Sequence, residues 1–128
     1  MKIVLSAQGD KGLEEQIDSR FGRCPFFVFV EVDKDKKEII EHKTIKNESA
    51  EQFGGAGTTS TQFVVNKGAK AVISPNIGPK AFQVLNQLGI EIYQGQGKVK
   101  DVVQEFLKGN LNKINQATGL LIWENNFF

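Results

Sequence analysis

Short apolar runs alternate with amphipathic stretches along this chain, and the alternation predicts an α/β fold. Five runs are rich in β-branched and aromatic residues and end at glycine or polar turns, as strands do. These strands are predicted at residues 2–7, 26–32, 38–45, 71–74 and 90–93. Apolar residues at helical spacing predict three helices, at residues 56–67, 79–88 and 99–107. The predicted order of elements is therefore βββαβαβα.

The strand–helix–strand units in the second half of the chain predict the topology. Such a connection is normally a right-handed crossover between parallel strands. The first, third, fourth and fifth strands should run parallel and the second should oppose them, which gives a mixed five-stranded sheet. The loop after the first strand, the approach to the first helix and the turns after the last two strands then share one edge of the sheet. Cys24 is expected at this edge too, because the second strand begins where the first ends.

The turn between residues 74 and 79 has the composition of a helix start. Asn76 can cap a helix, Gly78 allows close backbone approach, and Pro79 suits the first helical position. A helix that begins here presents N–H groups and a positive dipole end to whatever lies above the sheet edge. If the protein binds an anionic ligand, this edge is where we expect it; the same residues are also typical of a turn that binds nothing.

Residues 18–25 hold the densest set of chemically active side chains, including the single cysteine of the chain. Arg20 and Arg23 precede Cys24, and nearby positive charge favours the thiolate, the form that ligates soft metals. The sequence thus predicts a lowered pKa for the Cys24 thiol, and arginine donors for an anionic ligand. The alternatives are a buried Cys24 that acts as a small apolar residue and an Arg20 that simply pairs with Asp18.

The remaining motifs argue against an enzyme. Residues 55–60 resemble a dinucleotide glycine fingerprint, but serine stands in the third glycine place and no buried strand precedes it. Gly55 and Gly57 either cup an anion with their N–H groups or give the chain room to turn. His42, the single histidine, lies in the third strand without an assigned role. No Ser/His/acid set is evident, and the first strand lacks the acidic residue that a two-metal nuclease uses to hold magnesium. We therefore predict a binding or carrier protein.

Composition and charge narrow the choice of partners. The 128 residues are 40% hydrophobic and 24% charged, as expected of one soluble domain with a substantial core. Sixteen basic and fifteen acidic residues leave a net charge of +1, so no strong field attracts nucleic acid or an anionic membrane. No apolar run approaches the roughly 20 residues of a membrane span, and one cysteine excludes an internal disulfide. We expect a cytoplasmic protein.

The chain is predicted to divide into one domain, residues 1–110, and an apolar tail, residues 111–128. The end of the tail is rich in leucine, isoleucine, tryptophan and phenylalanine, and is too apolar for an ordinary disordered terminus. Docking on the chain's own domain is one interpretation, and contact with a partner or a second copy is the other.

Three motifs, in this order, resemble the dinitrogenase iron-molybdenum cofactor biosynthesis family, which includes NifX-like carriers and the C-terminal part of NifB-like proteins. The motifs lie at residues 20–27, 54–57 and 73–81, and the likeness covers about residues 1–110. The resemblance implies a ribonuclease-H-like fold. It also implies binding of an anionic iron-sulfur or iron-molybdenum-sulfur cluster, or its precursor, without catalysis.

Under this hypothesis one edge of the sheet holds the cluster, with Cys24 as the metal ligand. Arginines, helix N-termini and one thiolate suit an anionic, sulfur-rich group. A single cysteine does not complete a ligand set, so a homodimer, non-protein ligands or outer-sphere binding is required. The expected partner is a cluster donor or acceptor protein. The alternatives are a metal-free interaction module acting through the tail and a small-molecule anion binder. The expected cofactor-binding residues are Arg20, Phe21, Gly22, Arg23, Cys24, Gly55, Gly57, Asn76 and Gly78.

Overall fold

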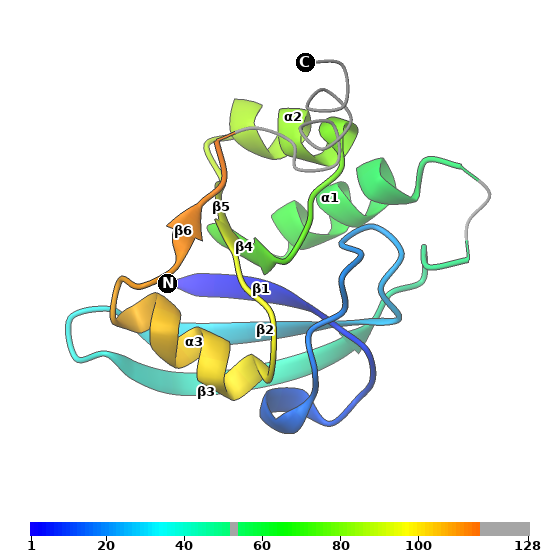
Figure 1. Cartoon of the computed structure of the whole chain (residues 1–128). Coiled ribbons are helices and arrows are strands. Elements are labelled where there is room, and N and C mark those ends of the chain that lie inside the picture. Colours follow the sequence, from blue (N-terminus) through cyan, green and yellow to red (C-terminus); the bar gives the residue numbers. More distant parts are fainter. Residues whose placement is uncertain (52–53, 116–128) are drawn as a thin grey trace, which may run out of the picture.

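The computed structural model describes residues 1–51 and 54–115, and in these residues a central sheet lies between helices (Figure 1). The helices are α1 (Ala56–Asn66), α2 (Pro79–Gln87) and α3 (Val99–Leu107), with one 3₁₀ turn, η1 (Gly12–Glu14). The strands are β1 (Lys2–Ala7), β2 (Phe26–Asp33), β3 (Glu38–Lys46), β4 (Ala71–Ser74), β5 (Glu91–Gln94) and β6 (Asn112–Lys113). None of the helices described is long and apolar enough to cross a membrane.

The sheet is mixed, with strand order β3-β2-β1-β4-β5-β6. β1 pairs parallel to β4, and β4 parallel to β5, whereas β2 is antiparallel to both of its neighbours. These directions, the α/β class and the three helices confirm the sequence-based prediction for the part of the chain described. The ribonuclease-H-like assignment stays a prediction.

The predicted number of strands is wrong, because the described residues form six strands and not five. β6 has only two residues, both polar and exposed, so no alternation of apolar and polar residues predicts it. It is held by antiparallel pairing with β5 and by Ile114, whose N–H donates to the Ile92 carbonyl at 2.7 Å. β6 thus lies within the segment predicted as the tail, and the apolar end of that tail, residues 116–128, lies outside the described residues.

The sheet buries an apolar core on each face. On β1, Ile3 and Leu5 point into the core that α3 covers, whereas Val4 points into the core beneath α1 and α2. The strand is therefore buried on both sides, which explains its continuous apolar run. The same alternation places residues of β2 and β4 in both cores. Because β1 and β4 are parallel neighbours in the middle of the strand order, their carboxyl ends lie at the centre of one sheet edge.

Backbone hydrogen bonds hold the long β1–β2 connection, residues 8–25, against this edge. The N–H of Asp18 donates to the Ser6 carbonyl at 3.0 Å, and that of Ile17 donates to the Gly97 carbonyl at 2.8 Å. Further along, Phe21 is 3% exposed and lies 5.5 Å from the Phe27 ring, centroid to centroid. Backbone bonds and one buried ring therefore hold the connection in place across the strand ends.

Candidate functional site

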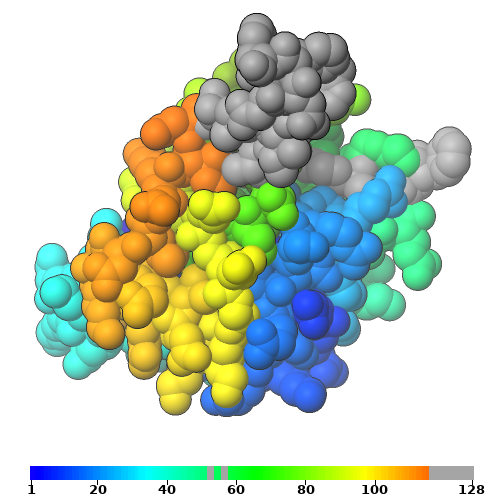
Figure 2. Space-filling view, in the orientation of Figure 1, coloured from blue at the N-terminus to red at the C-terminus, as the bar shows by residue number. Residues whose placement is uncertain are grey.

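A groove of about 470 Å³ lies where the β1–β2 connection meets the start of α2, and we call it the edge groove. Figure 2 shows the two contributing segments side by side on one face, the connection in blue and the β4–α2 turn in green. Six of the predicted binding residues come together here, as the crossover argument anticipated. The residues that line the edge groove are Ser19, Arg20, Phe21, Gly22, Arg23, Asn76, Ile77 and Gly78.

The wall formed by the β4–α2 turn contains the N-terminus of α2. Gly78 is the N-cap, with an extended backbone (φ −72°, ψ 162°), and Pro79 follows at the first helical position. The expected cap residue, Asn76, precedes the N-cap position by two residues, and Gly78, which occupies that position, has no side chain with which to cap the helix. The first turn therefore presents backbone N–H groups and the positive end of the helix dipole to the edge groove.

The two arginines of the opposite wall are oriented by neighbours. Arg20 donates from Nε and Nη2 to the two carboxylate oxygens of Asp18, at 3.1 and 3.2 Å, which confirms the expected pairing. The hydrogen bond and the charge of Asp18 raise the pKa of Arg20. The Arg20 side chain is nevertheless 60% exposed, whereas that of Asp18 is 8% exposed. Arg23 donates from Nη1 to the Ala50 carbonyl at 3.3 Å. Both guanidinium groups thus have fixed anchors and remain at the surface.

Cys24 lies behind the edge groove, not in it. Its side chain is fully buried, and Sγ donates to the Phe21 carbonyl at 3.1 Å. Burial, with the negative charge of Asp18 as a second cause, raises the pKa of the Cys24 thiol to about 12. The predicted lowering of this pKa is therefore wrong, because the arginine side chains pair with Asp18 and Ala50 while the thiol is desolvated. Ligation of a metal by Cys24 stays a prediction, and it requires this loop to move.

The glycine-rich segment begins α1. Gly55 is the N-cap and has a left-handed backbone (φ 72°), a conformation that favours glycine, and Gly57 lies in the first turn. Gly55 is not among the described residues that line the edge groove, so its geometry favours the turn-forming interpretation; the anion-binding role of both glycines stays a prediction. α1 reaches the groove loop through Ser60, whose hydroxyl donates to the Gly22 carbonyl at 2.9 Å.

Asn47, which was not predicted as a functional residue, follows β3 and is only 3% exposed. Its Nδ2 donates to the carbonyls of Gly22 at 3.1 Å and Cys24 at 2.8 Å. In the sequence it stands between a lysine and a glutamate, in a stretch that is typical of a solvent-exposed turn. Only the tertiary structure shows that this amide is buried against the loop that carries Arg20, Arg23 and Cys24.

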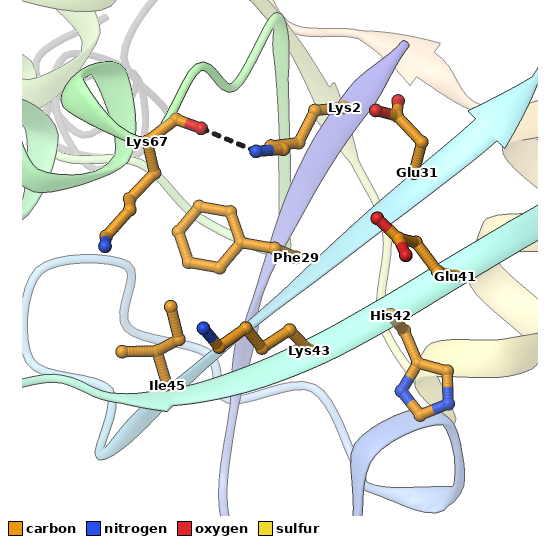
Figure 3. Close-up of a pocket in the computed structure, with 8 residues that line it drawn as sticks. All are labelled: Lys2, Phe29, Glu31, Glu41, His42, Lys43, Ile45 and Lys67. Atoms are coloured by element: carbon orange, nitrogen blue, oxygen red, sulfur yellow. Dashed lines mark hydrogen bonds between the residues drawn. The ribbon is translucent and has the colours of Figure 1, made fainter.

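A second hollow, of about 250 Å³, lies on the β1–β3 face near the C-terminal end of α1 (Figure 3). Lysines and glutamates of opposite charge surround Phe29 there, and Lys2 donates from Nζ to the Lys67 carbonyl at 2.8 Å. Figure 3 shows the His42 ring turned away from Phe29 and toward η1, where a Cβ on Gly12 would lie 3.2 Å from its Cε1. This hollow includes none of the predicted binding residues.

The described residues include no group of three or more histidine, cysteine or acidic side chains placed to hold a metal ion. Cys24 alone provides a soft ligand, and its thiol is buried. What the edge groove does provide is hydrogen-bond donors and positive charge. Its chemistry therefore suits an anion that is recognised through its outer atoms.

Comparison with known proteins places most of the described chain in one family. The family model described as dinitrogenase iron-molybdenum cofactor matches residues 1–109. A relative from Methanocaldococcus jannaschii, named "Uncharacterized protein MJ0580", is 36% identical over 114 residues, which cover 88% of this chain and 91% of the relative.

Two solved structures share the fold and a fraction of the sequence. The apo form of the orange protein (ORP) from Desulfovibrio gigas has a TM-score of 0.80 and 32% identity, over 91% of this chain and 95% of that one. A putative NifB protein from Thermotoga (TM1290) has a TM-score of 0.74 and 25% identity, over 91% and 96% of the two chains. The family match spans the three helices, five of the strands and both walls of the edge groove. The chain belongs to the dinitrogenase iron-molybdenum cofactor family.

Proposed function

We propose that this chain is a non-catalytic accessory protein that binds an anionic iron-sulfur or molybdenum-containing cluster, or its precursor, in the edge groove. Family membership and the NifB-like structural neighbour support an accessory role in cofactor biosynthesis. The observation that carries the proposal is the meeting of Arg20 and Arg23 with the N-terminus of α2 across one groove.

The groove chemistry suits outer-sphere binding. Metal-sulfur clusters and oxo-molybdenum anions carry negative charge on peripheral sulfur or oxygen atoms, which accept hydrogen bonds from guanidinium and backbone N–H groups. Gly22 contributes no side chain to the wall, and a Cβ built on Gly78 would meet nothing within 4 Å, so a bulky anion can approach the backbone here. The site therefore binds by charge and shape, and a complete set of protein ligands is not needed.

Direct ligation by Cys24 is the finer hypothesis. It requires the loop to open and the thiol to lose its proton, and coordination to a metal favours that loss of the proton. Because the thiol is buried with a pKa of about 12, outer-sphere binding comes first in the sequence of events we propose. Ligation would follow only if the loop rearranges around the bound anion.

Anaerobic reconstitution with iron, sulfide and molybdate, followed by metal analysis and visible absorption, tests the proposal. We expect the wild-type chain to retain metal with charge-transfer bands, and the double variant Arg20→Ala/Arg23→Ala to lose most of it. Lys43→Ala/Lys67→Ala is the matched control, because it removes the same charge from the second hollow. Equal loss in both double variants would mean that only net charge matters, and a colourless wild-type chain would reject cluster binding by this chain alone.

Cys24→Ser separates the two modes of binding. Under outer-sphere binding this variant keeps the metal and the absorption bands of the wild-type chain. Loss of the bands in this variant, with its folding intact, would show that the thiol is a ligand.

A small-molecule anion binder is the second candidate, and the burial of the Cys24 thiol favours it. It predicts that molybdate or phosphate raises the melting temperature without any iron, that this shift survives Cys24→Ser, and that it disappears in the double arginine variant. The interaction module acting through the apolar tail, the cluster donor or acceptor partner and the cytoplasmic location stay predictions.

A further inference from the structure

One buried side chain, Asn47, holds the groove loop, which is residues 20–24 of the β1–β2 connection, on its buried side. Its Nδ2 donates to the carbonyls of Gly22 and Cys24 at 3.1 and 2.8 Å. Its Oδ1 accepts from the N–H of Ser49 at 3.0 Å and lies 3.4 Å from the hydroxyl oxygen of Ser60. One amide therefore connects the loop, the end of β3 and α1.

Both N–H groups of this amide donate, and its oxygen accepts one full hydrogen bond, from the N–H of Ser49. The single hydroxyl proton of Ser60 goes to the nearer acceptor, the Gly22 carbonyl, and not to this oxygen. The Gly22 carbonyl accepts a second bond, from Ser60 at 2.9 Å. Buried networks of this kind specify one arrangement, because each broken bond leaves a desolvated polar atom without a partner.

Two other attachments of the loop act before residue 22: Phe21 packs its ring into the core beside Phe27, and the pairing of Arg20 with Asp18 fixes the start of the loop. Between Phe21 and the start of β2, the side chains of Arg23 and Cys24 bond to the carbonyls of Ala50 and Phe21. The backbone carbonyls of Gly22 and Cys24 accept from Asn47, and that of Gly22 also accepts from Ser60. This stretch contains Arg23, which lines the edge groove, and Cys24, which lies beneath it.

We propose that Asn47 is a positioning residue: it sets the conformation of residues 22–24, and thereby controls both the anion affinity of the edge groove and the access of reagents to the Cys24 thiol. The first half of this inference rests on the proposed function of the groove. The second half does not, because the burial of the thiol is a property of the fold alone. Asn47 itself is not among the described residues that line the groove.

The rate of thiol modification is the first readout. Cys24 is the single cysteine of the chain, so a neutral disulfide reagent reports on one site. Asn47→Leu keeps the size and the lack of charge of the side chain and removes both N–H donors. We expect its thiol to react about 10- to 100-fold faster than that of the wild-type chain, because two buried hydrogen bonds no longer oppose local opening of the loop.

Val103→Ala is the matched control, since Val103 is a fully buried residue of α3, in the core on the opposite face of the sheet. This substitution lowers the melting temperature without touching the loop. An equal rise of the thiol rate in this variant, or no rise in Asn47→Leu, would overturn the inference. If Asn47→Leu does not fold, Ser60→Ala replaces it, because it removes one donor to the Gly22 carbonyl. Its thiol modification rate is then compared with that of Val103→Ala in the same way.

Equilibrium dialysis with molybdate is the second readout. We expect several-fold weaker binding by Asn47→Leu and unchanged binding by Val103→Ala. Unchanged molybdate binding in an Asn47→Leu variant whose thiol is exposed would overturn the part of the inference that concerns affinity. If the wild-type chain binds neither molybdate nor a reconstituted cluster while the thiol rate still rises, the proposed function is wrong and the control of thiol access by Asn47 is supported.

Discussion

Alkaline pH should destabilise this protein through one buried thiol. In the folded chain the pKa of Cys24 is raised from 9.0 to about 12, because the side chain is desolvated and lies near the charge of Asp18. Below pH 9 the folded and unfolded states both keep the proton, so the thiol contributes no pH dependence. Above pH 9 the unfolded chain releases the proton and the folded chain keeps it. Each further pH unit then lowers the free energy of unfolding by about 1.4 kcal/mol.

The size of the effect follows from the two pKa values. Between pH 9.0 and about 12 the full loss is about 4 kcal/mol. By about pH 10.5 it should reach about 2 kcal/mol, which is a large part of the 5–15 kcal/mol typical of a domain. Stability is therefore fully retained below the pKa of the unfolded thiol and is lost as the pH rises toward the pKa of the folded one.

Urea denaturation at about pH 8 and about pH 10.5, for the wild-type chain and for Cys24→Ser, measures this loss. The serine variant has no thiol to titrate, whereas its lysines and Tyr93, whose pKa is also raised by burial, respond as in the wild-type chain. The difference between the two pH effects isolates Cys24. Equal losses in the two chains would refute the reasoning, and would mean that the thiol ionises in the folded state through an open loop.

Three further predictions concern packing and the end of the chain. Gly95→Ala should lower the free energy of unfolding by about 1–3 kcal/mol in urea denaturation, because the new Cβ would lie 2.7 Å from a valine methyl group of α3. Gly78→Ala is the control: it has open space around it and should change the free energy of unfolding by less than about 0.5 kcal/mol. Phe27→Ala should cost about 3–5 kcal/mol by the same assay, since the ring is fully buried among three other phenylalanines, and a loss below about 1 kcal/mol would contradict this packing. A chain that ends at residue 110 should melt at a lower temperature than one that ends at residue 115, because the shorter chain lacks β6 and the buried isoleucine after it; equal melting temperatures would mean that this edge contributes nothing.

The order of the elements could be predicted because local sequence decides it. β1 and β4 are continuous apolar runs, since both faces of each strand are covered, and glycines with left-handed backbones at residues 68, 89 and 109 follow the helices. β6 was not predicted because two polar residues show no alternation of apolar and polar positions. They form a strand only because β5 offers an unpaired edge beside them.

The location of the edge groove was also determined by the sequence, through topology. Parallel strands bring their carboxyl ends to one edge, so the loop with Arg20 and Arg23 and the turn with Gly78 were expected at the same edge. They meet there because β1 and β4 are neighbours in the sheet, which the structure shows. No information about side-chain direction was needed for that step. The residue types then indicated an anionic ligand.

Only the tertiary structure decided how the side chains at that edge are used. Sequence neighbours suggested that two arginines lower the pKa of Cys24, yet the guanidinium groups pair with Asp18 and Ala50, and the thiol is buried. Asn47 stands in a polar stretch that looks exposed, yet its amide is enclosed by two carbonyls of the β1–β2 connection, the hydroxyl of Ser60 and the N–H of Ser49. Strand and helix periodicity depends on neighbouring residues, so the sequence alone predicted the α/β class, the three helices and the strand directions, and placed the candidate site residues at one edge. Burial and hydrogen-bond partners depend on contacts between distant parts of the chain, so the sequence alone did not predict the state of the thiol.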